Sequence, residues 1–163
     1  MVIYVLFILS ILLFSAGIAG WMAAPYVPTR KQDVGRFLEI AEIKPGDIFF
    51  DLGCGDGRIP AAAAKACAKA FGFEISILNY LFCKFFRRNF KVKFINFFTA
   101  DYKNTDVVYM FLSQKVHNKM GRILKNQMKK GSKIVTYVWP IEGIEPASVN
   151  RVDGYPNLFL YIL

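Results

Sequence analysis

Two carboxylates and three glycines gather in residues 51–57 (DLGCGDG), a spacing well suited to ligand chemistry. A short apolar run at 48–50 leads into Asp51, and an alanine-rich run follows Arg58. This pattern predicts a strand, a tight glycine turn and a helix over 59–70. An acid that ends such a strand lies at the carboxyl edge of the sheet, where open α/β folds bind ligands.

The charges in this loop favour a ligand that carries a cationic group. Gly53, Gly55 and Gly57 alternate with other residues, whereas the dinucleotide fingerprint has the spacing G-x-G-x-x-G. Asp51 precedes the glycines and Asp56 lies among them, so a pyrophosphate would meet two negative charges. A cationic amino group suits the same position. A dinucleotide site and a structural turn without a ligand are the alternatives.

The pattern D-x-G-x-G-x-G resembles motif I of the class I S-adenosylmethionine-dependent methyltransferases. Their cofactor carries an α-ammonium and a sulfonium, which agrees with the carboxylates of the loop. The resemblance implies that S-adenosylmethionine binds here. The loop residues expected to contact it are Asp51, Gly53, Cys54, Gly55 and Asp56.

Further cofactor contacts are expected after the next two strands. Residues 70–75 predict a second strand ending at Glu74, about 20 residues after the loop, where an acid reaches ribose hydroxyls. Ile75 would lie beside the adenine as an apolar surface. Residues 92–98 predict a third strand, and Asp101 and Tyr102 follow it. In the methyltransferase fold an acid here commonly contacts the adenine amino group, although Asp101 also suits a turn.

The net charge of +9 lies entirely after residue 24, within a chain of 163 residues that has room for one domain. A basic domain suits nucleic acid, an acidic protein or an anionic membrane surface. The densest basic run, 84–93, has phenylalanines interleaved. We favour the interpretation that this run is a helix with an aromatic core face and a solvated basic face. The second interpretation is contact with anionic lipid headgroups. The third is binding of single-stranded nucleic acid. Nucleic acid is therefore not expected as the main partner.

Cysteine and histidine usage gives no familiar metal site. The three cysteines form no C-x-x-C pair, and there is a single histidine. The odd number of cysteines fits a reducing compartment rather than a disulfide framework. We expect no metal in the site.

Residues 1–24 contain no charged side chain and predict a single transmembrane helix. A helix of that length spans roughly 36 Å, and a hydrocarbon core is about 30 Å thick. A cleavable signal peptide and a buried core helix are the alternatives. Because Arg30, Lys31 and Arg36 flank the run on one side only, the positive-inside rule places the N-terminus outside and the domain on the cytoplasmic, or matrix-equivalent, side of a membrane.

Strand and helix patterns alternate through the rest of the chain. An amphipathic helix is predicted at 31–43, further helices at 76–90 and 113–130, and strands at 106–112 and 132–139, with a final hairpin of 148–152 and 158–163. The fold class is α/β, and the methyltransferase resemblance implies a Rossmann-like sheet of order 3-2-1-4-5-7-6. We divide the chain into an anchor (1–24), an exit segment with the leading helix (25–45) and an S-adenosylmethionine-binding domain (46–163).

Four sequence features point to a narrower group: the YVPT exit, DLGCGDGRIPAAAAKA, GFEI and VVYMFLSQKV…KGSKIVTYVWP. Together they resemble the small membrane-anchored lysine methyltransferases related to the ATP synthase c-subunit lysine N-methyltransferase. Cys54 stands where serine is expected in that group. The resemblance implies methyl transfer to a lysine of a small membrane protein, with the bilayer as a further partner.

The sequence names no catalytic base. Tyr102, Tyr109, His117 and Trp139 lie near predicted strand ends and are candidates for an acceptor pocket. His117 is a possible base, although an exposed or capping role is the favoured interpretation. No asparagine-proline-proline-tyrosine motif follows the fourth strand, which counts against adenine and glutamine methyltransferases. A lipid or quinone methyltransferase and a non-catalytic membrane-tethered binding module are the alternative functions.

Overall fold

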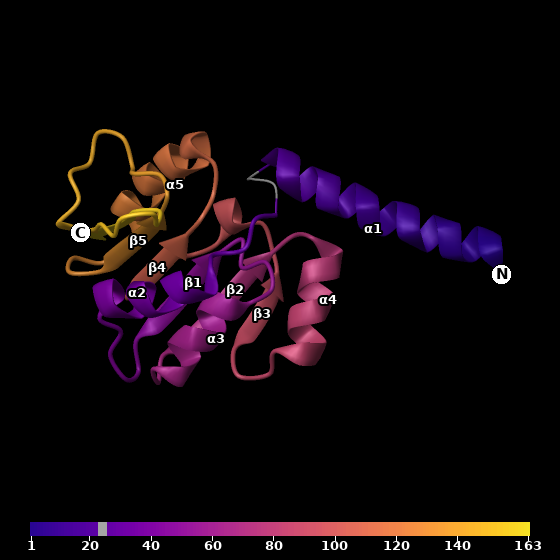
Figure 1. Ribbon diagram of the computed structural model, residues 1–163, viewed down its shortest axis with the longest axis horizontal. Coiled ribbons are helices and arrows are strands. Elements are labelled where there is room, and N and C mark those ends of the chain that lie inside the picture. The colour runs from indigo at the N-terminus through magenta and orange to yellow at the C-terminus, as the bar shows by residue number, and fades with distance from the viewer. Residues whose placement is uncertain (23–25) are drawn as a thin grey trace.

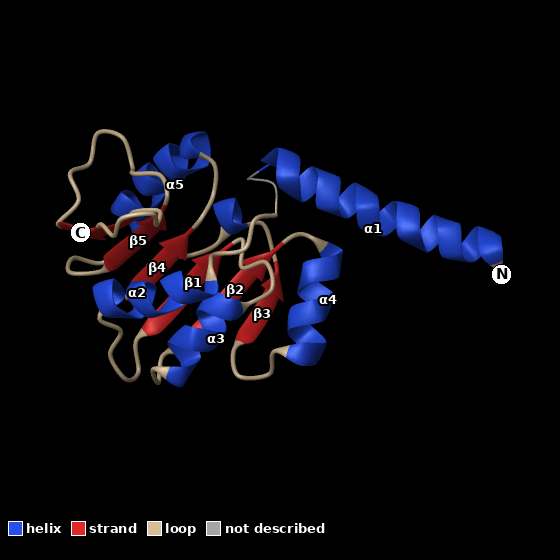
Figure 2. Cartoon of the chain, in the orientation of Figure 1, coloured by secondary structure: helices blue, strands red, loops and turns tan. Residues whose placement is uncertain are grey.

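The computed structural model describes residues 1–22 and 26–163, and its centre is a seven-stranded sheet (Figures 1 and 2). The strands are β1 (Ile48–Leu52), β2 (Lys69–Glu74), β3 (Lys91–Phe94), β4 (Val107–Met110), β5 (Lys133–Tyr137), β6 (Ser148–Asn150) and β7 (Leu158–Ile162). Their order is β3-β2-β1-β4-β5-β7-β6, which confirms the predicted order. The predicted boundary between anchor and exit segment, at residues 24 and 25, lies outside the described residues.

Strands β1 to β5 are parallel to one another, and β7 is antiparallel to both β5 and β6. The central strands β1 and β4 are buried along almost their whole length, which explains their continuous apolar sequences. Parallel strands place all their carboxyl ends at one edge. The ends of β1, β2 and β4 therefore meet there, and the glycine loop follows the first of them.

Helices cover both faces of the sheet (Figure 2). The helices are α1 (Val2–Met22), α2 (Lys31–Ala41), α3 (Arg58–Lys65), α4 (Ile77–Phe86) and α5 (Gln114–Gln127), with a short 3₁₀ turn at Phe97–Thr99. Successive residues of β1 point to opposite faces. Phe49 packs in one core with Phe37 of α2 and Cys83 of α4, whereas Phe50 packs in the other with Met120 of α5. Helices α2, α3 and α4 thus cover one face, and α5 covers the other.

Several elements end earlier than the sequence predicts, and local turns explain two of these differences. The helix after the glycine loop ends at Lys65 rather than at residue 70, because Cys67 adopts a left-handed conformation (φ 67°) and turns the chain into β2. The third strand ends at Phe94 rather than at residue 98. Asn96 then begins the 3₁₀ turn, and its side chain accepts a hydrogen bond from the Phe98 N–H. Both errors arise from short-range turns that apolar periodicity does not reveal.

Helix α2 is tied to the C-terminal hairpin by Arg36. Its guanidinium donates to the side chain and the carbonyl of Asn150 and to the Pro156 carbonyl, and it pairs with Asp33. Asp33 is fully buried and accepts a hydrogen bond from the Tyr137 hydroxyl of β5. These contacts join α2, which we assigned from sequence to a leading segment, to the last strands of the sheet.

Helix α1 extends away from the sheet on the side of α4 (Figure 1). Large apolar side chains are exposed along it, including Ile3 at 79 % and Phe14 at 72 %. The transmembrane helix predicted over residues 1–24 is not confirmed. Within residues 1–22 and 26–163, no helix is found with the length and apolarity needed to cross a membrane.

His117 connects the ends of β4 and β5 from a fully buried position on α5. Its Nε2 accepts a hydrogen bond from the Leu112 N–H (3.0 Å), and its Nδ1 lies 2.9 Å from the Trp139 carbonyl oxygen, to which the neutral ring donates. Burial lowers the pKa of His117 to about 4. The histidine is therefore neither the exposed or capping residue that we favoured nor a free base, because both ring nitrogens are occupied by backbone groups.

His117 makes the fold sensitive to acid. The unfolded chain binds the proton near the ordinary pKa of about 6.5 and the folded chain only near 4, so the free energy of unfolding falls between these values as the pH is lowered. The full loss is about 3 kcal/mol. We expect the stability advantage of the parent over His117→Gln to shrink by that order between pH 7 and pH 4, measured by denaturant unfolding at each pH. Buried carboxylates titrate in both proteins and cancel in the difference. A difference that stays constant with pH would contradict this role.

Candidate active site

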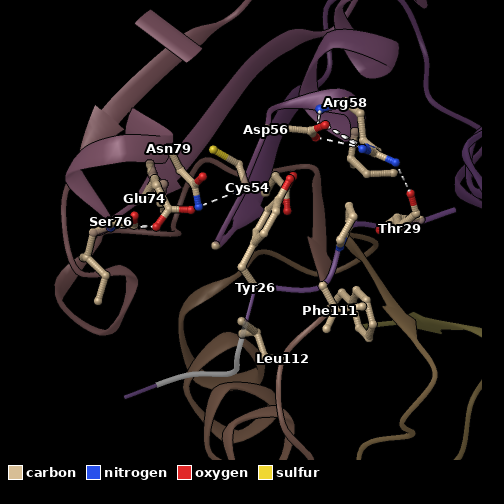
Figure 3. Close-up of a pocket in the computed structure, with 18 of the residues that line it drawn as sticks. Tyr26, Thr29, Cys54, Asp56, Arg58, Glu74, Ser76, Asn79, Phe111 and Leu112 are labelled. Carbon is tan, nitrogen blue, oxygen red and sulfur yellow. Dashed lines mark hydrogen bonds and ion pairs between the residues drawn. The ribbon is translucent and has the colours of Figure 1, made fainter. Parts of the chain in front are cut away.

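A cavity of about 200 Å³ opens at the carboxyl ends of β1, β2 and β4 (Figure 3). Seven of the nine residues predicted to contact the cofactor line it. They are Asp51, Gly53, Cys54, Gly55, Asp56, Glu74 and Ile75. The parallel order of the sheet brings them together, since the glycine loop follows β1 and Glu74 ends the neighbouring β2.

The glycine loop folds back onto the end of β2. The Gly53 and Cys54 N–H groups both donate to the Phe73 carbonyl, at 2.9 and 3.0 Å. Gly55 and Gly57 have left-handed backbones, with φ of 54° and 75°. A Cβ on Gly57 would also lie 2.5 Å from the Phe90 ring. Glycine at this position is therefore required both by the turn and by close packing.

Glu74 holds this loop through its backbone. One carboxylate oxygen accepts a hydrogen bond from the Gly55 N–H at 2.9 Å. The other accepts from the Ile75 and Ser76 N–H groups at 2.9 and 2.8 Å. Burial raises the pKa of Glu74, and these backbone hydrogen bonds lower it in part. A carboxylate has about four acceptor positions, so it keeps the capacity to bind a further donor, such as a ligand hydroxyl.

Asp51 is buried, with 3 % of its surface exposed, yet its carboxylate accepts no hydrogen bond from the described residues. Burial, and then repulsion by Glu74 and Asp56, raise the pKa of Asp51 well above its ordinary value. A buried carboxylate without a donor is costly for the fold. A cationic ligand group in the cavity would supply both the missing donors and the opposite charge.

Asp56 is neutralised by the protein itself. Arg58 donates from Nε and Nη2 to its carboxylate, at distances down to 2.6 Å (Figure 3). Burial raises the pKa of Asp56, but the hydrogen bonds and charge of Arg58 outweigh it and hold the pKa below its ordinary value. Although Asp56 lines the cavity, the unpaired negative charge that we attributed to it belongs to Asp51 and Glu74.

Residues 26–29, between α1 and α2, cross the cavity. The Tyr26 ring packs against the glycine loop, where a Cβ on Gly55 would lie 2.8 Å from it. Thr29 forms a hydrogen bond with the Tyr109 hydroxyl at 2.9 Å, and its carbonyl accepts from Arg58 Nη1 at 2.6 Å. Our sequence interpretation missed this role, because it treated the YVPT motif only as an exit segment and a family signal. The YVPT signal was noticed, but its distance from the loop depends on tertiary structure.

The proposed acceptor-pocket residues separate into two groups. Tyr109 lines the cavity together with Phe111 and Leu112, which the sequence interpretation missed. Burial raises the pKa of Tyr109 well above its ordinary value, so its hydroxyl keeps its proton and is not a general base. His117 and Trp139 are not among the lining residues.

The structure does not bring Asp101 and Tyr102 to the cavity. The Asp101 side chain is exposed and accepts a hydrogen bond from the Lys103 N–H at 3.0 Å, in the turn that was its alternative interpretation. Tyr102 is fully buried, and its hydroxyl donates to the Phe97 carbonyl. Phe97 itself lines the cavity, so the segment after β3 contributes through that residue instead.

We expect Asp51 to lower the stability of the ligand-free protein and to strengthen the binding of S-adenosylmethionine. Asp51→Asn removes a buried charge without a partner, so we expect the ligand-free protein to gain roughly 1 kcal/mol in the free energy of unfolding. The affinity for S-adenosylmethionine should fall at least about tenfold, because an amide cannot neutralise an ammonium group. Calorimetry of binding and thermal unfolding measure the two effects. Asp47→Asn, at the opposite end of β1, is the matched control and should keep the parent affinity. Equal affinities of the Asp51 and Asp47 variants would contradict the assignment.

Known proteins share both the sequence and the fold around this cavity. Residues 51–148 match the family described as ANTKMT methyltransferase domain. A protein-lysine N-methyltransferase of Saccharolobus islandicus is 38 % identical over 151 residues, covering 85 % of this chain and 93 % of that protein. The ATP synthase c-subunit lysine N-methyltransferase of Xenopus laevis is 40 % identical over 55 residues, which are 34 % of this chain and only 24 % of that protein.

A solved structure agrees with these matches. The RNA methyltransferase of Salinibacter ruber, crystallised with S-adenosyl-L-homocysteine, superposes with a TM-score of 0.77 at 28 % identity, over 83 % of this chain and 93 % of that one. S-adenosylhomocysteine is what remains of S-adenosylmethionine after methyl transfer, so the bound product identifies the cofactor. The chain belongs to the ANTKMT methyltransferase domain family and is a class I S-adenosylmethionine-dependent methyltransferase related to the ATP synthase c-subunit lysine methyltransferases.

Proposed function

We propose that this enzyme methylates the side-chain amine of a protein lysine. The observation that carries the proposal is the 38 % identity, over nearly all of both chains, to a protein-lysine N-methyltransferase. The site supports it. Beside the unpaired Asp51, the cavity is bordered by Tyr26, Phe111 and Leu112, a mostly aromatic and apolar surface that suits the stem of a lysine.

We assign different parts of the cofactor to different residues of the cavity. Asp51 would bind the ammonium group, Glu74 would bind the ribose hydroxyls, and Ile75 would lie beside the adenine. The absence of a side chain at Gly55 leaves room for the Tyr26 ring, which covers the loop that would hold the cofactor. The adenine contact predicted for Asp101 and the cofactor contact predicted for Tyr102 remain a proposal. For Asp101, the contact requires its carboxylate to leave the Lys103 N–H.

The chemistry asks for little beyond positioning. S-adenosylmethionine supplies a methyl group already activated by its sulfonium. The chain must align the amine with that group and exclude water. With the cofactor and the amine bound, the methyl group would pass from the sulfonium sulfur to the lysine nitrogen, whose extra proton would then leave to water. An apolar border lowers the pKa of the entering lysine, so the neutral amine can react without a dedicated base.

The acceptor that we propose is a lysine of a small membrane protein, with α1 holding the enzyme at the bilayer. Helix α1 carries no charged side chain, and it leaves the domain beside the cavity, which its Gly20 helps to line. The Xenopus relative is named for the c-subunit of ATP synthase, which agrees with such an acceptor. In this proposal the domain lies on the cytoplasmic, or matrix-equivalent, side.

Acceptors of two other kinds compete with a protein. A lipid or quinone would also reach an enzyme held at a membrane. An RNA acceptor is favoured by the net charge of +9 and by the name of the Salinibacter relative. A binding module without turnover, the third alternative from sequence, is disfavoured by the methyltransferase family to which the chain belongs.

Radiolabelled S-adenosylmethionine separates these acceptors. Full-length protein in detergent is incubated with membranes and RNA from the source organism, and the label is divided into protein, solvent-extractable and ribonuclease-sensitive fractions. We expect protein-bound label that mass spectrometry locates on lysine, lost with Asp51→Ala and kept with Asp47→Asn. Label confined to the solvent or ribonuclease-sensitive fraction would replace the proposal with a lipid or an RNA acceptor.

Tyr26 should affect turnover more than stability. Its ring packs on Gly55 while 56 % of its surface is exposed, so Tyr26→Ala should change the free energy of unfolding by less than about 1 kcal/mol. We expect kcat/KM to fall about tenfold, because the ring covers the loop that positions the cofactor. Tyr26→Phe keeps the ring and should stay near the parent value in the same assay. Equal losses in both variants would show that the hydroxyl, not the covering ring, matters.

A further inference from the structure

Helix α4 carries a second apolar face that is largely exposed to solvent. Its Cys83 is buried against the sheet, whereas Phe85 and Phe86 on the outer side are 59 % and 74 % exposed. The exposed apolar residues of this region are Leu78, Leu81, Phe82, Phe85, Phe86 and, on the edge strand β3, Phe94. Phe82 and Phe86 also stack on each other, with ring centroids 5.4 Å apart. Burying these residues from water would be favourable.

The same region has only positive charge. Residues 75–100 contain five lysines or arginines and no aspartate or glutamate. Four of the cations are exposed: Lys84, Arg88, Lys91 and Lys93. The fifth, Arg87, donates a hydrogen bond to the Asp56 carbonyl and so contacts the glycine loop. We call these four cations and the six exposed apolar residues the α4 face.

The α4 face is continuous with α1 and with the mouth of the cavity. Helix α1 lies next to α4 at its base and then extends away with its apolar side chains exposed (Figure 1). Leu78 of the α4 face and Gly20 of α1 both line the cavity. A surface that covered α1 and the α4 face together would therefore border the opening of the active site.

We propose that the α4 face docks on an anionic lipid bilayer, with its phenylalanines among the headgroups and its four cations paired with lipid phosphates. The inference rests on the membrane setting proposed above and adds the surface that orients the domain. Phenylalanine and leucine side chains on a basic amphipathic surface insert at the boundary between headgroups and acyl chains, and each cation near an anionic leaflet strengthens binding. Docked in this way, the cavity opens at the bilayer surface, where a lysine at the end of a membrane helix would lie.

A bilayer fits this face better than a nucleic acid. Single-stranded RNA also stacks on aromatic rings between cations. It gains little, however, from the exposed leucines Leu78 and Leu81 or from the uncharged helix α1 beside them. An anionic bilayer offers partners for the charged, aromatic and aliphatic parts of this surface at once.

Flotation with lipid vesicles tests the docking. Full-length protein is mixed with vesicles of phosphatidylcholine alone or with about one-third phosphatidylserine, a content that provides a negative surface. The test variant replaces Lys84, Arg88, Lys91 and Lys93 with glutamine. The matched control replaces Lys115, Arg122, Lys125 and Lys130 of the α5 region, also exposed but on the opposite side of the sheet. A second variant, Phe85→Ser with Phe86→Ser, keeps every charge.

We expect phosphatidylserine to strengthen the binding of the parent and of the α5 control equally. The α4 glutamine variant should bind the anionic vesicles at least about tenfold more weakly, and the phenylalanine variant about tenfold more weakly. Parent-like binding by the α4 glutamine variant, or an equal loss in the α5 control, would overturn the proposal. An α4 glutamine variant that loses binding to RNA but keeps binding to vesicles would also overturn the proposal and would assign the α4 face to nucleic acid. Cofactor binding and methyl transfer to a detergent-solubilised acceptor should persist in every variant. Failure of the docking proposal can therefore be distinguished from failure of the proposed methyltransferase function.

Discussion

The three backbone hydrogen bonds accepted by Glu74 are the constraint on which the rest of the site depends. They join the end of β2 to the glycine loop after β1 and to the start of α4, so one carboxylate sets the relative position of three elements. Such a group is satisfied only when all three are in place. The same loop contacts the Tyr26 ring and the Arg58 side chain, so the loop that Glu74 holds also carries these two side chains at the cavity.

The site combines stabilised and unstabilised charge within a short distance. Asp56 is matched by Arg58, and Glu74 by backbone donors, whereas Asp51 has no donor among the described residues and is buried against two other carboxylates. The fold tolerates this arrangement because the surrounding strands are densely packed with apolar residues on both faces. The negative charge that remains is the part that a cation from outside can use.

Much of this organisation was predictable from sequence, since it depends on local patterns. The glycine turn and the positions of Asp51 and Glu74 follow from apolar periodicity and from the spacing of motif I, whereas the strand order came from the resemblance to the methyltransferases. The pairing of Arg58 with Asp56, the place of Tyr26 over the loop and the burial of His117 were not predictable, because each joins a side chain to a partner chosen by tertiary packing. For Asp101 the family pattern was misleading. Its carboxylate, which that pattern assigned to the adenine, accepts a hydrogen bond from the Lys103 N–H in a local turn.

Arg58 binds the Thr29 carbonyl with one nitrogen and the Asp56 carboxylate with others, so the segment that follows α1 and the cofactor loop share a single guanidinium. Energetic coupling between two such parts is reciprocal. If ordering of residues 26–29 favours the bound form of the loop by some factor, occupation of the loop orders those residues by the same factor. The cofactor concentration then affects how well residues 26–29 are ordered. In return, whatever surrounds α1 and orders those residues affects how tightly the cofactor binds.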